Sequence, residues 1–220
     1  MGTTCSTLDV PPSESEVLTF PSLIDAESAA PLEIRVPTPV VEAQHLIDLH
    51  LLKGHFGGVT GALKNMFGLA RDVWDTVHGS RDGWPRWDSG VQCAELAAHP
   101  VLCDRRRLSI SEALFGTHNG ADRVPDPYVE TRLWDSDSPS SLVLSTNPVS
   151  HDSVLLSLIR AERAAAGEAN DQADDWIVSA AAAPYSLGIH EEGVLTEGGD
   201  GRWDLAFEEI RYRTVWMEEG

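Results

Sequence analysis

The residues best suited to chemistry lie in one short segment, from Lys53 to Gly68. This segment holds the only two lysines of the chain, Lys53 and Lys64, together with His55 and several glycines. Glycines allow a backbone to approach a ligand closely. Lysine and histidine side chains beside such a backbone suit a carboxylate or a phosphate, and histidine suits proton transfer. We therefore predict a binding site for a small anionic molecule, with Lys53, His55 and Lys64 as its catalytic residues.

Other residues near this segment are expected to contact the ligand. Thr60 and Asn65 would orient ligand oxygens, and a helix beginning near Thr60 would direct free amides and a positive dipole end at the ligand. Glu112 and Asp152 would line the same face from a neighbouring strand and helix. The predicted ligand-binding residues are Gly58, Thr60, Gly61, Asn65, Glu112 and Asp152. A structural alternative remains, a glycine turn with two exposed lysines and a half-buried histidine, because glycine-rich loops are common.

The spacing of the histidines does not favour a metal site. His45, His50 and His55 recur every fifth residue, and such spacing places neighbouring members on opposite faces of a strand. Because metal ligands must converge on one point, we predict no metal ligands. The sequence leaves the identity of any cofactor open.

The three cysteines, Cys5, Cys93 and Cys103, are an odd number without a Cys-x-x-Cys spacing. This argues against a disulfide framework and against a cysteine-ligated zinc or iron–sulfur site within the chain. We predict three free thiols.

Strands that alternate with helices predict an α/β fold with a mixed, partly parallel sheet and helices packed on its faces. In such sheets ligands bind beyond the carboxyl ends of the strands. Strands are expected at Val17–Phe20, Leu32–Val36, His45–Leu52, Arg107–Leu114, Ser141–Ser145 and Leu205–Val215. Helices are expected at Pro37–Gln44 (or a turn), from Thr60, at Val91–His99, from Asn147 to Ala166 with Asn147 as its cap, and at Asp171–Ala183.

The length of 220 residues fits a single domain with a substantial core. Residues 1–31, rich in Ser, Pro, Thr and Glu, are expected to be weakly structured or to form a partial N-terminal segment. The N-terminus has neither a basic start nor an apolar segment, and the longest apolar stretch, Ile177–Pro184, is far shorter than a membrane span. We therefore expect a cytoplasmic protein without a membrane partner.

The net charge of −19 comes from 35 acidic and 16 basic residues. Nucleic acid is excluded as a partner because such a surface repels phosphates. Two explanations for the acid excess remain. A GC-rich genome favours Arg, Ala, Gly and Asp, whereas a salt-loving organism uses carboxylates to keep its proteins hydrated. We favour the halophile, since composition bias alone does not require so large a charge.

Four motifs occur in a fixed order along the chain. They are Lys53-Gly-His55, Thr60-Gly-Ala-Leu-Lys-Asn-Met-Phe-Gly68, Ile110-Ser-Glu-Ala113 and Ser145-Thr-Asn-Pro-Val-Ser-His-Asp152. In this order they resemble the domain-of-unknown-function 362 family over roughly residues 32–215. Members have aspartate where Glu112 stands, and Asn147 and Ser150 also depart from the pattern. The family is uncharacterised and often associated with iron–sulfur proteins.

Two features of that family are missing, an early strand with a Lys-Pro-Asn segment and a ferredoxin-like cysteine cluster. The resemblance therefore implies that the chain lacks the family's N-terminal portion, because the gene start is misplaced, the chain is a fragment, or it is a reduced member. The stretch from His55 to Lys64 is also similar to a loop of nickel-pincer lactate racemases, in which the histidine is an acid/base and the lysine anchors the cofactor. Besides an enzyme, the resemblance allows an accessory or redox-partner module of an iron–sulfur system, or an inactive truncated member.

Overall fold

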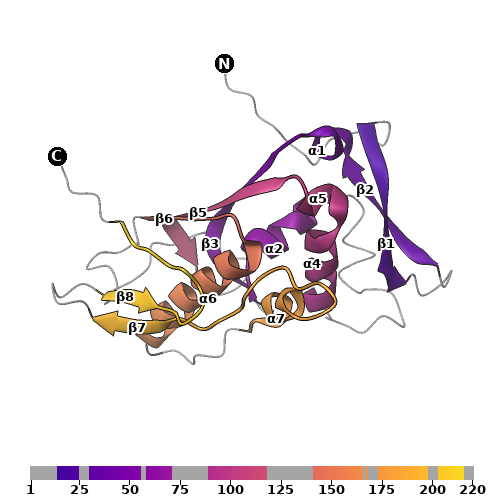
Figure 1. Cartoon of the computed structure of the whole chain (residues 1–220). Coiled ribbons are helices and arrows are strands. Elements are labelled where there is room, and N and C mark those ends of the chain that lie inside the picture. Colours follow the sequence, from indigo (N-terminus) through magenta and orange to yellow (C-terminus); the bar gives the residue numbers. More distant parts are fainter. Residues whose placement is uncertain are drawn as a thin grey trace, which may run out of the picture.

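The computed structural model of the protein describes residues 14–24, 30–55, 58–70, 89–117, 141–165, 167, 173–197 and 203–215. A four-stranded sheet forms its centre (Figure 1). Its strands are β3 (Leu46–His55), β4 (Gly58–Val59), β5 (Arg106–Thr117) and β6 (Ser141–Ser145), in the order β4-β3-β5-β6. The β3–β5 pair is parallel, whereas β4 and β6 are antiparallel to their neighbours. The predicted mixed, partly parallel sheet is therefore confirmed.

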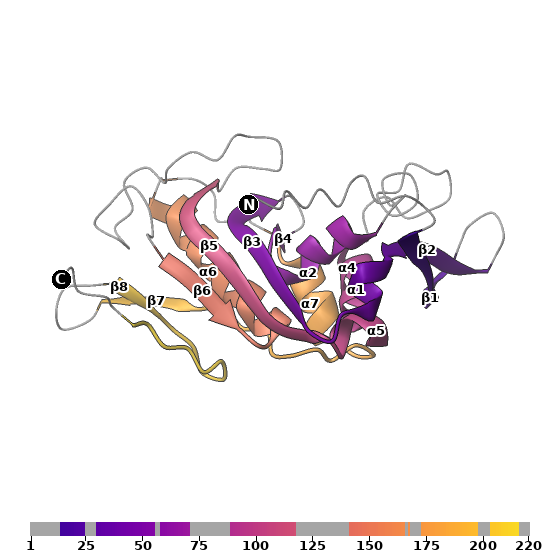
Figure 2. The same ribbon diagram turned by 90° about the horizontal axis from the view of Figure 1, so that it is seen from above.

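The described helices are α1 (Thr38–Glu42), α2 (Ala62–Asn65), the 3-10 helix η3 (Met66–Leu69), α4 (Ser89–Ala98), α5 (Pro100–Cys103), α6 (Pro148–Ala165) and α7 (Asp175–Ala181). Of these, α2, α6 and α7 contact strands of the central sheet. In Figure 2 α6 overlaps β5 and β6, and α2 and α7 lie beyond β3. Helix α6 begins as predicted, because Asn147 Oδ1 accepts a hydrogen bond from the Ser150 amide at 2.8 Å and a proline occupies the first helical position.

Two hairpins flank the sheet. The first joins β1 (Ser15–Ile24) to β2 (Pro31–Pro37), and it packs on the helical layer through Phe20, whose ring lies 4.7 Å from that of His99. Part of the segment expected to be weakly structured thus forms a long strand. The second joins β7 (Val194–Glu197) to β8 (Trp203–Ala206). The predicted strand at Leu205–Val215 is wrong beyond Ala206, and β7 was not predicted.

When helices cover one face of a sheet, the covered face is usually apolar and the exposed face polar. In this sheet the polarity of the two faces is reversed. On the inner face, which the helices cover, Asp48 and His50 of β3 are 5% and 8% exposed. On the outer face, Leu49 is 68% exposed and Leu144 of β6 is 56% exposed. Cross-strand register aligns the outer residues in rows, Ile47 with Leu108, Leu49 with Ile110 and Leu144, and Leu51 with Glu112 and Leu142. Much of the apolar core therefore lies among the helices.

Two local departures from the predicted elements affect the candidate site. Strand β3 continues through His55, so Lys53 and His55 belong to a strand that turns back into β4 and do not lie in a loop after it. Helix α2 starts at Ala62 and is one turn long. No helix in the described part of the chain combines the length and apolar character needed to cross a bilayer.

Candidate functional site

The β3–β4 hairpin places His55 against helix α7. The His55 ring meets the Trp176 ring edge-on, with centroids 5.3 Å apart, and His55 is 8% exposed. Trp176 Nε1 donates a hydrogen bond to the carbonyl of Val59 at 3.1 Å. A Cβ at Gly58 would lie 2.4 Å from the indole, so this position accommodates glycine alone. The structure thus gives Gly58, predicted to bind ligand, a packing role.

The two lysines lie within each other's electrostatic field. The Lys64 ammonium stands 4.3 Å from the centre of the Phe67 ring. Burial lowers the pKa of Lys64, the Cys93 thiol acts in the opposite direction, and the positive charge of Lys53 lowers it further. Lys53 comes from β3 and Lys64 from α2, so this electrostatic effect acts between two separate elements.

The start of α2 is occupied by a side chain. Asp152 of α6 is fully buried, and its Oδ1 and Oδ2 accept hydrogen bonds from the amides of Ala62 and Leu63 at 2.6 and 3.0 Å. A Cβ at Gly61 would lie 2.1 Å from Asp152 Oδ1, which explains the glycine. The prediction that this helix end presents free amides to a ligand is therefore wrong for Ala62 and Leu63, and Gly61 approaches a carboxylate of the protein itself.

The remaining predicted ligand residues are dispersed. Asn65 Nδ2 donates to Asp48 Oδ1 at 2.5 Å, so this amide faces the inner side of β3. The Thr60 amide donates to the Lys53 carbonyl at 2.7 Å and closes the hairpin. Glu112 lies between two fully buried residues of β5 and pairs with exposed Leu51, which puts it on the outer face.

Glu112 and Asp152 therefore lie on opposite faces of the sheet, contrary to our expectation. The carboxyl ends of β5 and β6 also lie at opposite edges of the sheet. Because β6 runs antiparallel to β5, Ser145 pairs with Ser109, far from the carboxyl end of β5.

A buried group of histidines and acids lies beneath the inner face, and sequence reasoning missed it. His50 Nε2 and His151 Nε2 are 3.0 Å apart, and His50 Nδ1 is 3.4 Å from Asp48 Oδ2. One donor atom from each of His50, His151 and Asp152 lies within 4.8 Å of the others. We call Asp48, His50, His151 and Asp152 the buried cluster.

Burial shifts the titration of two members of the buried cluster. It lowers the pKa of His151 to about 3, with a further contribution from His50, so this imidazole is neutral. It raises the pKa of Asp152 to about 7, although His50 and the two amide hydrogen bonds act in the opposite direction.

The argument against a metal site rested on the spacing of His45, His50 and His55. These three residues lie in different surroundings in the structure. His45 is exposed and receives a hydrogen bond from Arg107 Nε, whereas His55 packs on Trp176. Only His50 of the three joins the buried cluster, and its partner is His151 of α6. The available signal was the shared face of Asp48 and His50 on an alternating strand, together with the adjacent pair His151-Asp152 in the fourth motif.

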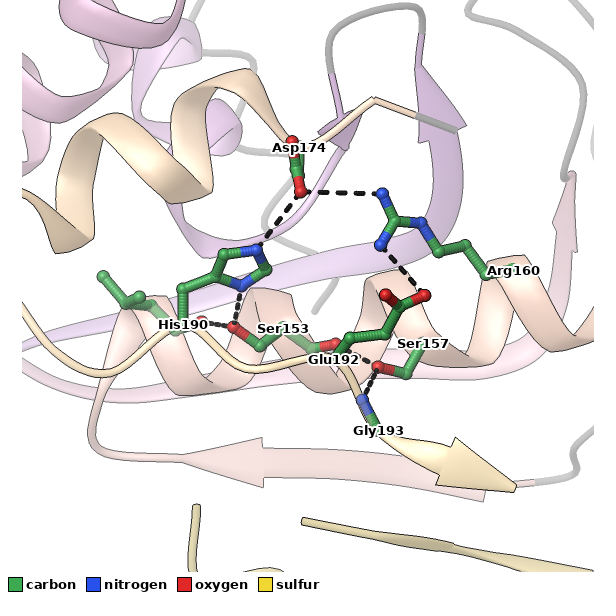
Figure 3. Close-up of polar contacts among 8 residues, drawn as sticks. Ser153, Ser157, Arg160, Asp174, His190, Glu192 and Gly193 are labelled. Atoms are coloured by element: carbon green, nitrogen blue, oxygen red, sulfur yellow. Dashed lines mark hydrogen bonds and ion pairs between the residues drawn. The ribbon is translucent and has the colours of Figure 1, made fainter. Parts of the chain in front are cut away.

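A second polar group, on the other side of α6, has the composition of a catalytic triad but not its geometry (Figure 3). Ser153 Oγ lies 2.9 Å from His190 Nδ1, and His190 Nε2 lies 3.3 Å from Asp174 Oδ2. Ser153 is fully buried and donates its proton to the Val149 carbonyl at 2.8 Å, so the histidine is the donor in the Ser153–His190 contact. This group fastens the segment around His190 to α6 and is not a nucleophile with its base.

The cysteines agree with the prediction as far as they are described. Cys93 and Cys103 are free thiols, the first fully buried and the second half-buried. Cys5 lies outside the described residues.

Comparison with known families identifies the chain. Residues 18–157 match a family model described as Domain of unknown function (DUF362). The chain belongs to the DUF362 family. The match begins earlier and ends earlier than the predicted range of 32–215, and the DUF362 region contains the buried cluster and both lysines but not α7. Neither the curated proteins nor the solved structures include a match to this chain.

Proposed function

We propose that the protein is an enzyme that binds a small anionic substrate, a carboxylate or a phosphate, between Lys53 and Lys64, with His55 as the proton-transfer group. The observation that supports this proposal is the approach of the only two lysines of an acidic chain from two different elements. A net charge of −19 offers many carboxylate partners, yet within the described part of the chain no carboxylate is among the groups that shift the pKa of Lys64.

The electrostatic argument concerns the cost of placing two cations together. Lys64 is partly buried, so its repulsion from Lys53 is less screened than between exposed groups. An anion between the ammonium groups replaces that repulsion with two attractions. The electrostatic energy gained when the repulsion is replaced contributes to the binding free energy. It favours compact ligands with a localised negative charge.

The role of His55 follows from its position on the same strand. It lies two residues after Lys53, and its contact with Trp176 fixes the plane of the imidazole. A fixed imidazole beside an anion-binding pair suits proton removal from a carbon or hydroxyl of the bound molecule. The similarity of this segment to the lactate racemase loop suggests an α-hydroxy carboxylate as the first substrate to test.

Binding is tested by calorimetric titration of the full chain with inorganic phosphate and with L-lactate. We expect binding of at least one probe, and loss of that binding in the double variant Lys53→Gln/Lys64→Gln. The matched control is Arg35→Gln/Arg211→Gln, which removes the same charge from two exposed positions. Equal loss in both double variants would assign binding to net charge alone and contradict the proposal.

Proton transfer is tested separately, by following deuterium incorporation at the α-carbon of L-lactate in heavy water by NMR. We expect His55→Gln to abolish exchange and the exposed-site variant His45→Gln to retain it. Circular dichroism shows whether each variant is folded. Exchange that survives in folded His55→Gln would remove His55 from the mechanism and leave the lysine pair as a binding site.

A further inference from the structure

We propose that His50, His151 and Asp152 form a binding site for a divalent first-row transition-metal ion, located between the inner face of β3 and helix α6. This site goes beyond the proposed function, because it uses none of Lys53, His55 and Lys64, the residues to which the proposed function assigns anion binding and proton transfer.

The first support is the distance between the two imidazoles. His50 Nε2 and His151 Nε2 form a hydrogen bond of 3.0 Å, with the rings edge-on and their centroids 5.0 Å apart. Two nitrogens that each lie about 2.1 Å from one ion, at about a right angle, are about 3.0 Å from each other. The two rings therefore already have the separation of neighbouring ligands, and an Asp152 oxygen completes the three donors within 4.8 Å.

The second support is the set of contacts that orient the donors. Asp48 Oδ2 faces His50 Nδ1 at 3.4 Å, within ion-pair distance but without hydrogen-bond geometry. A carboxylate on this side of the ring is common for metal-binding histidines. Asn65 holds the other Asp48 oxygen at 2.5 Å. Each Asp152 oxygen accepts one amide hydrogen bond, which fixes the carboxylate and leaves each oxygen a further lone pair.

The third support is a set of buried polar side-chain atoms that form no hydrogen bond with the described residues. Ser111 Oγ and His151 Nδ1 have no hydrogen-bond partner among these residues, although Ser111 is fully buried and His151 is 1% exposed. Ser111 pairs in register with His50 and lies on the same inner face. Buried polar atoms of this kind lower stability unless a ligand or water binds them. A water ligand of the inferred ion would give Ser111 Oγ a partner, whereas His151 Nδ1, across the ring from Nε2, would remain outside the coordination.

The donor types select the class of metal. Two imidazoles and one carboxylate suit Fe²⁺, Co²⁺, Ni²⁺ or Zn²⁺, whereas Mg²⁺ and Ca²⁺ prefer oxygen ligands alone. Three protein ligands leave further coordination positions open, as in catalytic and not structural zinc sites. The inferred site is therefore one in which the ion keeps coordination positions for water or another exogenous ligand.

The test uses the full chain treated with a chelator, dialysed and titrated with Co²⁺. We expect one ion per chain, visible d–d absorption bands typical of nitrogen ligation, and displacement by Zn²⁺. His50→Gln and His151→Gln should each weaken Co²⁺ binding at least tenfold, whereas the control His190→Gln, in the other polar group, should not. Asp48→Asn removes only a positioning contact, and we expect a loss of about 10–100-fold.

If those variants fail to fold, the metal site is tested on the wild-type protein. Titration with Zn²⁺, followed by nitrogen NMR of the imidazoles, should shift the Nε2 resonances of two buried histidines. Absence of stoichiometric Co²⁺ binding, or Zn²⁺ shifts confined to exposed histidines such as His45, would overturn the metal site. The Lys53→Gln/Lys64→Gln variant should bind Co²⁺ with unchanged affinity, so failure of the anion proposal and failure of the metal proposal give different results.

Discussion

The inner face of the central sheet carries Asp48, His50 and Ser111, whereas the outer face carries Ile47, Leu49 and their neighbours on β5 and β6. These residues alternate along the same strands, so the two faces share one backbone and differ only in what covers them. The helices α2 and α6 cover the polar face. Burial in this domain is thus decided by the position of the helical layer and not by the polarity of the strand residues.

This difference shows where the fold accepts a cost in stability. Polar and charged groups lose their hydration when they are buried, and only good hydrogen bonds offset that loss. Asn65 and the amides of Ala62 and Leu63 supply such bonds to Asp48 and Asp152. Departures from the usual burial pattern are expected at functional sites, and the inner face is such a departure.

The largest expected effect is at Asp152. Its replacement by alanine leaves the buried amides of Ala62 and Leu63 without acceptors, at about 1–3 kcal/mol each, so we expect a loss of about 2–6 kcal/mol. Urea unfolding measures the free energy. The control Asp104→Ala, at an exposed helix end, should change it by about 0.5 kcal/mol or less. Similar values for the two variants would mean that α2 finds other partners.

A pair of leucines on β3 compares the two faces directly. Leu52 is fully buried, and Leu52→Ala should reduce the free energy of unfolding by about 2–5 kcal/mol. Leu49, three residues earlier, is 68% exposed, and Leu49→Ala should change it by about 0.5 kcal/mol or less. Chemical denaturation at low protein concentration gives both values. A large loss of unfolding free energy in Leu49→Ala would show that the outer face is covered in solution. It would contradict the statement that only the inner face is buried.

Lys64 lies in helix α2, and its contribution to the free energy of unfolding should depend on pH. Its pKa in the folded chain is lowered by burial from the ordinary value of 10.5. The resulting penalty is complete below the folded pKa and disappears as the pH rises through the unfolded pKa. Relative to Lys64→Met, the wild type should therefore gain stability between pH 7 and pH 10.5. The same comparison with Arg35→Gln, at an exposed site, should show no such gain.

The smallest expected effect involves neither face. A net charge of −19 opposes compaction, and salt screens this repulsion. We expect the midpoint of thermal unfolding to rise by a few degrees between low salt and molar potassium chloride, as the halophile interpretation requires. A midpoint that stays constant or falls would leave genome composition as the explanation for the acidic residues.

Local signals predicted much of the fold. The cap at Asn147, the apolar run of β3 and the strand Ser141–Ser145 were all identified from nearby residues, because each depends on local hydrogen bonds or periodicity. Alternation also shows that Asp48 and His50 share a face. It does not show which face the helices cover, and a rule that buries apolar residues would choose the wrong one.

The sequence identified only those candidate residues that lie close to one another along the chain. Lys53, His55 and Lys64 lie close together in the sequence, so a shared segment identified them. The contact of His50 with His151 joins residues 101 positions apart, and only the path of α6 across the sheet brings them together. The placement of Glu112 was wrong because alternation along β5 does not show which face of the sheet α6 and its Asp152 cover.

The separation of these contacts along the chain also affects how the protein is made. The amide of Ala62 finds its acceptor on a residue 90 positions later, and the carbonyl of Val59 receives its hydrogen bond from an indole 117 positions later. At a synthesis rate of about 5–20 residues per second, β3 and α2 leave the ribosome on the order of ten seconds before those partners. Contacts of such high order form slowly. Throughout that interval Leu52, which is fully buried in the folded chain, has neither α6 nor α7 to cover it, and chaperones that bind aliphatic segments have time to engage the nascent chain.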